Sequence, residues 1–116
     1  MISVLMCVYN GENYIVDAIE SILNQTYKKF EFIVINDDSN DETSSILDKY
    51  AEKDNRIIIY NNKKRLGFTK SLNVGLKRCR TEFVACIDHD DLWDKNKLKL
   101  QIDFMNNNQD VGVLGT

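Results

Sequence analysis

An almost unbroken apolar run near the start of the chain is the feature that most constrains its fold. Residues 2–8 read Ile-Ser-Val-Leu-Met-Cys-Val. A strand with one wet face alternates apolar and polar residues, whereas a continuous run is typical of a strand covered on both faces. Such strands occur in parallel sheets that carry helices on both sides. We therefore predict a central strand at residues 2–8.

Further apolar segments alternate with stretches of helical periodicity. Four more strands are predicted at residues 30–35, 57–60, 83–87 and 111–114. The intervening helices have apolar positions at Tyr14, Ile15, Ala18, Ile19, Ile22 and Leu23, at Ile46, Leu47, Tyr50 and Ala51, at Leu72, Val74 and Leu76, and at Leu98, Leu100, Ile102, Phe104 and Met105. Strands alternating with helices predict an α/β fold with a mostly parallel sheet flanked by helices. Because the last strand begins near the end of the chain, we expect a sheet truncated after about the fifth strand.

The composition is that of a globular domain. The 116 residues are 43% apolar and 28% charged, and 15 basic residues against 18 acidic ones give a net charge of -3, too balanced for a general nucleic-acid binder. Cys7, Cys79 and Cys86 lack C-x-x-C spacing, so we expect buried free thiols and a cytoplasmic location. The longest apolar stretch, residues 4–9, is far shorter than the ~20 residues of a membrane helix.

Four polar residues, Asp88-His89-Asp90-Asp91, follow the strand at residues 83–87, and we call this segment the acidic turn. Alternate residues of an extended segment project the same way, so Asp88 and Asp90 can converge on one point. Two adjacent carboxylates need a compensating cation, and their hard oxygens suit Mn²⁺ or Mg²⁺. The alternative is a solvated turn that caps the helix near Lys95. His89 points the other way, and we expect it to pack or to hydrogen-bond rather than to bind metal.

Asp37 ends the second predicted strand, at the same edge of the sheet as the acidic turn. Its carboxylate could accept a hydrogen bond from a ligand, and the imide N–H of uracil matches it well. The alternative role is an Asx turn or a helix cap. Asp38, Ser39 and Asp41 are better placed for capping, which leaves Asp37 free for another role.

An aromatic and a basic residue complete the predicted nucleotide site. Tyr9 ends the first strand, where its ring could stack on a base, although it could also be an ordinary boundary aromatic. The basic run at residues 63–65 precedes Gly67 and could meet a diphosphate, although such runs are usually only solvated. Within the run, we select Arg65 as the ligand-binding residue.

Five segments, taken together, resemble the family 2 glycosyltransferases, which have the GT-A fold, a Rossmann-like α/β architecture. They are Val8-Tyr9-Asn10-Gly11, residues 20–27 (Glu-Ser-Ile-Leu-Asn-Gln-Thr-Tyr), residues 36–43 (Asn-Asp-Asp-Ser-Asn-Asp-Glu-Thr), Leu72-Asn73-Val74-Gly75-Leu76 and Asp88-His89-Asp90-Asp91. Each segment is weak evidence alone, but they occur in the family's order across nearly the whole chain.

The resemblance implies metal-assisted transfer of a sugar from a nucleotide diphosphate donor, commonly UDP-linked, to a saccharide or lipid-linked acceptor, as in polysaccharide biosynthesis. By motif match, Asp37 would hold the base and Tyr9 would pack against it. Asp88 would lie near the ribose and the metal, and Asp90 would bind the metal, Mn²⁺ or Mg²⁺, with Asp91 as a secondary candidate.

The chain departs from the family pattern at a few positions. Cys7 stands where many relatives have proline, Asn36 where many have an acid and Asp38 where a small residue is frequent, which weakens the choice of donor base. The family's catalytic base lies beyond the D-x-D motif, so we expect it beyond Thr116. Residues 1–116 are then the N-terminal nucleotide-sugar-binding part of a glycosyltransferase domain, without the acceptor-binding part and poorly active or inactive alone. Any association with the inner face of a membrane would come from other regions.

Other classes of protein fit the pattern less well. A phosphorylation-controlled receiver domain would need its acidic pair after the first strand, and a dinucleotide-dependent oxidoreductase would need G-x-G-x-x-G there. The first strand is followed instead by Tyr9-Asn10-Gly11. A nucleotidyltransferase and a noncatalytic nucleotide-sugar-binding module remain as alternatives.

Overall fold

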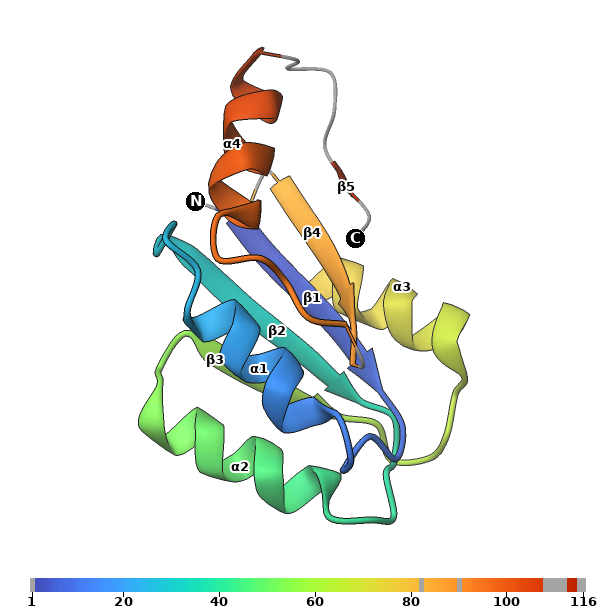
Figure 1. The fold of residues 1–116 in the computed structure, drawn as a ribbon. Coiled ribbons are helices and arrows are strands. Elements are labelled where there is room, and N and C mark those ends of the chain that lie inside the picture. Colours follow the sequence, from blue (N-terminus) through green and yellow to red (C-terminus); the bar gives the residue numbers. More distant parts are fainter. Residues whose placement is uncertain (1, 82, 90, 108–112, 115–116) are drawn as a thin grey trace.

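The computed structural model describes residues 2–81, 83–89, 91–107 and 113–114 and shows a single α/β sheet structure (Figure 1). The elements along the chain are β1 (Ile2–Val8), α1 (Ile15–Leu23), β2 (Phe30–Asn36), α2 (Thr43–Lys53), β3 (Ile57–Asn61), α3 (Phe68–Arg78), β4 (Phe83–Asp88), α4 (Lys97–Asn107) and β5 (Val113–Leu114). All paired strands are parallel, in the order β3-β2-β1-β4-β5. This order of elements confirms the α/β prediction. No helix in the described ranges is long and apolar enough to span a membrane.

The strand predicted to be central is central. β1 pairs with β2 on one side and with β4 on the other. All seven residues of β2 are buried, and in β1 only Cys7 is half-buried. Both strands lie between layers of helices, which explains why their sequences show no alternation of polar and apolar residues.

The helices form one layer on each face of the sheet. Ile2, Val4, Met6 and Val8 point into a core that also contains residues of α1, α2 and α4, whereas Leu5 points into a second core beneath α3. Figure 1 shows α1 and α2 in front of the sheet and α3 behind it. The predicted helices are present, but Tyr14, Leu76, Leu100 and Phe104, which we counted as apolar positions of helices, are exposed.

The exposure of Leu76 has a steric cause. The buried residues of α3 are Ser71 and Gly75, because this helix lies very close to the sheet. A Cβ atom at Gly75 would overlap the side chain of Leu5 and would lie 3.1 Å from Cγ1 of Ile35. Small residues therefore form the contact, and the large Leu76 side chain turns to solvent.

The strand order creates a crevice at one edge of the sheet. From β1 the chain proceeds outward to β3, and it then crosses to the other side of β1 to form β4. In parallel sheets, ligands bind beyond the carboxyl ends of the strands at such a reversal. The ends of β1, β2 and β4 and the loop after β3 meet there (Figure 1), and we call this edge the rim.

A buried carboxylate lies at the opposite end of the sheet, near the start of β2. Glu31 is 5% exposed and accepts hydrogen bonds from Ser3 Oγ at 2.6 Å, from the Arg80 backbone N–H at 2.9 Å and from Arg80 Nε at 3.1 Å. Burial alone would raise the pKa of Glu31, but these donors and the Arg80 charge hold it below its ordinary value of 4.5. Glu31 thereby fastens the connection between α3 and β4 to the sheet.

We predict that Glu31→Gln lowers the free energy of unfolding at pH 7 by about 1–3 kcal/mol, because the buried Ser3 hydroxyl and the Arg80 donors lose a charged acceptor. The folded-state pKa is lowered, so this stabilisation is present above pH 4.5 and is lost as the pH falls through the folded-state value. Urea unfolding at several pH values measures the effect, with the exposed Glu52→Gln as the control. A deficit that stays constant down to the acid limit would contradict the assigned role.

Candidate functional site

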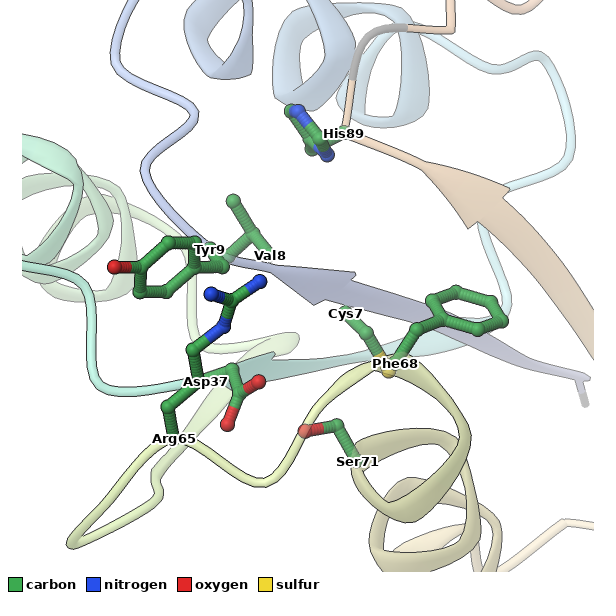
Figure 2. A pocket seen from close by; sticks show the side chains of 8 residues that line it. All are labelled: Cys7, Val8, Tyr9, Asp37, Arg65, Phe68, Ser71 and His89. Atoms are coloured by element: carbon green, nitrogen blue, oxygen red, sulfur yellow. The ribbon is translucent and has the colours of Figure 1, made fainter.

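A pocket of about 240 Å³ opens on the rim (Figure 2). It is lined by Cys7, Val8, Tyr9, Asp37, Arg65, Phe68, Ser71 and His89. These residues come from the ends of β1 and β2, the loop before α3, the first turn of α3 and the turn after β4. The fold thus brings Tyr9, Asp37 and Arg65, three of the predicted nucleotide-binding residues, into one pocket.

Asp37 is the buried charge of this pocket. It is 4% exposed, and its backbone N–H donates to the carbonyl oxygen of Val8 at 2.8 Å. Its Oδ1 accepts from Asn62 Nδ2 at 2.9 Å and from the Leu66 N–H at 2.7 Å, and its Oδ2 accepts from the Gly67 N–H at 2.9 Å. As expected, Asp37 makes no capping bond to α2 among the described contacts, and its role in binding a ligand stays a prediction. Its carboxylate holds the loop before α3.

These hydrogen bonds determine the charge of Asp37. Burial alone would raise the pKa of its carboxyl group, yet donors from Leu66, Asn62, Gly67 and Ser71 outweigh burial and keep the pKa below 3.8. Asp37 is therefore an anion at neutral pH. A carboxylate in this state can only accept hydrogen bonds, so it selects ligand groups that carry N–H or O–H.

Asn62 is a site residue that the sequence analysis missed. Its Nδ2 donates to Asp37 Oδ1 and, at 3.0 Å, to Ser71 Oγ, while its backbone N–H donates to the carbonyl oxygen of Asn36 at 2.9 Å. It connects the end of β2 to α3. The only signal in the sequence is a polar residue directly after a strand, which is too common to identify a partner 25 residues away.

Arg65 and Tyr9 contact each other in the pocket. The Arg65 guanidinium carbon lies 3.9 Å from the centroid of the Tyr9 ring, a stacked cation–π arrangement. Figure 2 shows the guanidinium group beside the ring. Lys63, Lys64 and Arg65 are all exposed, but of these three residues Arg65 is the one that lines the pocket. The selection of Arg65 from the basic run is consistent with its position in the pocket.

The acidic turn lies beside the pocket. Asp88, exposed at the end of β4, is in register with Cys7 of β1, and its carbonyl oxygen accepts the Asp91 N–H at 3.0 Å. Asp37 and Asp88 follow the two strands that flank β1, so roughly 10 Å, two strand spacings, separates their backbones. Asp90 lies outside the described residues, so its convergence with Asp88 stays a prediction.

The chemistry of the acidic turn suits a hard cation. Asp88 and Asp91 offer only oxygen donors, as Mg²⁺ and Mn²⁺ prefer. Within the described ranges, no group of three His, Cys, Asp or Glu side chains could hold an ion on protein ligands alone.

His89 packs as expected. A Cβ atom at Gly11 would lie 2.8 Å from Cδ2 of His89, so the imidazole ring lies directly against the glycine backbone. This contact joins the loop after β1 to the turn after β4. It also explains the glycine, because a side chain at position 11 would displace the ring that forms one end of the pocket.

The three cysteines are free, but they are half-buried rather than buried as expected. Burial, together with the smaller effects of nearby Cys86, Asp37 and Asp88, raises the pKa of the Cys7 thiol to about 12. Cys7 therefore lines the pocket as a neutral thiol at physiological pH. A thiol in this state is a poor nucleophile, so Cys7 lines the pocket without acting as a reactive group.

A second missed residue, Gln25, fixes the segment that follows the acidic turn. Its side chain is fully buried. Nε2 donates to the carbonyl oxygens of Ser21 at 3.0 Å and of Asp94 at 2.6 Å, and Oε1 accepts the Leu98 N–H at 3.0 Å. The neighbouring Thr26 N–H donates to the carbonyl oxygen of Lys95 at 2.7 Å. The end of α1 thus holds the chain between the acidic turn and α4.

Comparison with known sequences identifies relatives over nearly the whole chain. Residues 3–116 match the family described as Glycosyl transferase family 2. An uncharacterized glycosyltransferase of Haemophilus influenzae is 40% identical over 116 residues, which are 100% of this chain and 36% of the relative.

Two solved structures have a similar fold. Staphylococcus aureus TarS 1-349 in complex with UDP-GlcNAc has a TM-score of 0.86 and 32% identity, and the match covers 93% of this chain and 32% of that one. The mannosyltransferase PcManGT from Pyrobaculum calidifontis, in complex with GDP-Man and Mn²⁺, has a TM-score of 0.84 and 26% identity. That match covers 90% of this chain and 32% of the mannosyltransferase chain. The chain thus spans about a third of the length of each of these proteins.

We predict that Gln25→Ala destabilises the chain by about 1–3 kcal/mol, because the Leu98 N–H and the Asp94 carbonyl group lose a buried partner. For a domain of this size the midpoint of thermal unfolding should fall by roughly 4–15 °C. Circular dichroism melting measures the shift, and the exposed neighbour Asn24→Ala is the control. Equal melting temperatures of the two variants would show that the hydrogen bonds of Gln25 to Asp94 and Leu98 do not stabilise the fold.

Proposed function

We propose that this chain, which belongs to glycosyl transferase family 2, binds a UDP-sugar across the rim, with the base at Asp37 and the diphosphate near the acidic turn. The observation that carries the proposal is the pocket that joins Asp37 to Tyr9 and Arg65 and ends beside Asp88. Family membership supports sugar transfer in general, and we propose a saccharide or lipid-linked group as the acceptor of the whole enzyme.

The hydrogen bonding of Asp37 favours uracil over guanine. An ionised carboxylate has about four acceptor positions. Two on Oδ1 are taken by Asn62 and Leu66, and one on Oδ2 is taken by Gly67. The Ser71 hydroxyl also donates to this carboxylate, so a ligand that displaces it finds at most one position. Uracil presents a single imide N–H, whereas the edge of guanine presents adjacent N–H and NH₂ donors that need both oxygens. The two solved relatives hold donors of both kinds, UDP-GlcNAc and GDP-Man, so this local feature is needed to choose between them.

A divalent ion is the cofactor that the proposal requires. Asp88, Asp90 and Asp91 would hold it, and the Mn²⁺ in the complex of the mannosyltransferase supports the choice of metal. When bound, the ion would act as a Lewis acid that neutralises charge on the departing nucleotide diphosphate. The contribution of this chain is to position the donor. Asp37 fixes the base, and Tyr9 and Arg65 line the nucleotide site. The hydrogen bonds of Gln25 hold the segment that follows the acidic turn.

The expected base preference can be measured directly. We predict that the chain binds UDP about tenfold or more tightly than GDP in the presence of Mn²⁺, because guanine would leave one donor unpaired at a cost of about 1–3 kcal/mol. Isothermal titration calorimetry with both nucleotides provides the two dissociation constants. A chain that binds GDP as tightly as UDP would refute uracil recognition by Asp37.

The metal site can be tested without catalysis. We predict that Mn²⁺ strengthens UDP binding in the unaltered chain, and that Asp90→Asn removes most of this enhancement while leaving uridine binding unchanged, because uridine has no diphosphate to share the ion. In an enzyme that turns over, the same substitution should cost on the order of a few kcal/mol of transition-state stabilisation.

The control for this experiment is Asp103→Asn, which removes an exposed carboxylate from α4 outside the acidic turn. It should keep the full effect of Mn²⁺ on UDP affinity. If Asp90→Asn also keeps it, Asp90 is not a metal ligand, and the acidic turn has the structural role of a solvated loop.

A further inference from the structure

The acceptor positions of the Asp37 carboxylate are filled from within the chain. An ionised carboxylate has about four such positions. Asn62 and Leu66 donate to Oδ1, Gly67 donates to Oδ2, and the Ser71 hydroxyl is the fourth donor. Figure 2 shows this hydroxyl directed toward the carboxylate. An N–H group of a ligand can therefore bind Asp37 only if one of the four donors gives up its place.

Three of the four donors are fixed in place. The donors from Leu66 and Gly67 are backbone N–H groups of the loop before α3, so they cannot turn away unless the loop itself moves. The Asn62 side chain also donates to Ser71 Oγ at 3.0 Å, and its backbone N–H donates to the carbonyl oxygen of Asn36 at 2.9 Å. Both the side chain and the backbone of Asn62 therefore have further partners that hold this residue.

The Ser71 hydroxyl is the donor that can change its partner. A hydroxyl hydrogen turns about the C–O bond, while the oxygen keeps its lone pairs as acceptors. A serine in a helix can also donate to the carbonyl oxygen three or four residues earlier. The Ser71 backbone N–H already donates to the carbonyl oxygen of Gly67 at 3.0 Å, and this oxygen has a second lone pair. The Gly67 carbonyl group can therefore accept the hydroxyl that Asp37 releases.

Two other helices of this chain contain serines that bond to their own helix. Ser21 Oγ in α1 donates to the carbonyl oxygen of Ala18 at 2.7 Å, and Ser45 Oγ in α2 donates to the carbonyl oxygen of Glu42 at 3.0 Å. Ser71 differs from both, because it is fully buried, lines the rim pocket and donates to a carboxylate. The local bond of a helical serine thus remains as the alternative for Ser71.

We infer that Ser71 is the exchangeable donor of the nucleotide site: its hydroxyl pairs with Asp37 until a base enters, and then yields this position to the imide N–H of the base. The inference rests on the proposed function and adds a residue that determines nucleotide affinity. The carboxylate has four donors before and after the exchange, so its charge stays fully paired. As a consequence, Ser71 competes with the base and lowers the affinity for it.

The test measures the dissociation constants of uridine, UDP and inorganic pyrophosphate, in the presence of Mn²⁺, for the unaltered 116-residue chain and its variants. Ser71→Ala should bind uridine and UDP about two- to tenfold more tightly, because the base no longer displaces a hydrogen bond of ordinary strength. Ser71→Cys keeps a weaker donor at this position and should have intermediate affinities. Pyrophosphate, which has no base, should bind all three proteins equally.

Ser21→Ala is the matched control, because it removes a serine hydroxyl from a helix outside the pocket. It should leave all three affinities unchanged. We expect Ser71→Ala to melt at a lower temperature than the unaltered chain, because the Asn62 side chain loses an acceptor. A loss of stability cannot account for tighter binding, so the sign of the change in affinity separates competition from a purely structural role of Ser71.

Two results would overturn the inference and can be told apart. If the unaltered chain binds neither uridine nor UDP, the proposed function fails, and the exchange at Asp37 fails with it. If it binds both but Ser71→Ala binds them equally well or more weakly, the proposed function stands and Ser71 does not compete with the base. An equal gain in pyrophosphate affinity would likewise reject competition at Asp37.

Discussion

A carboxylate buried as deeply as Asp37 can remain ionised only if hydrogen-bond donors replace the water it has lost. Asp37 obtains its donors from Asn62, Leu66 and Gly67, all on the segment between β3 and α3. The charge therefore dictates the path of that segment, and the segment in turn carries Arg65 and Phe68 into the pocket. The loop structure at the rim and the proposed recognition of the base therefore depend on the same two oxygen atoms.

The remaining parts of the site are positioned by contacts across the sheet. The β1 strand lies between the strands that carry Asp37 and Asp88, so the distance between these two carboxylates follows from strand spacing. The turn after β4 is held from two sides, by the contact of His89 with Gly11 and by the hydrogen bonds of Gln25 to the segment before α4. Gly11 and Gln25, which make these contacts, lie in the first quarter of the chain. The early loops therefore help to position the segment that contains and follows the acidic turn.

Sequence patterns predicted the strands well because both faces of β1 and β2 are covered, which leaves a continuous apolar signal. They predicted the packed faces of the helices less well. At α3 the close approach to Leu5 selects Ser71 and Gly75, which carry no apolar periodicity, and Leu76 is exposed. Tyr9 and Asp37 were predicted from their place at strand ends and Arg65 from the basic run before Gly67, and the structure brings all three into one pocket. Asn62 and Gln25 were missed because their partners are distant in sequence, and no local pattern reveals such pairs.

Glu31 and its partners lie at the amino-terminal end of β2, a full strand length from Asp37. Each end of this strand thus carries one buried carboxylate, and the two have separate sets of donors. The carboxylate proposed to recognise the base is in this way kept apart in space from the carboxylate that holds the connection between α3 and β4. In evolution or in the laboratory, stability could be adjusted at the Glu31 end of the strand without altering the proposed nucleotide site, whereas a change at Asp37 would alter the loop before α3 as well.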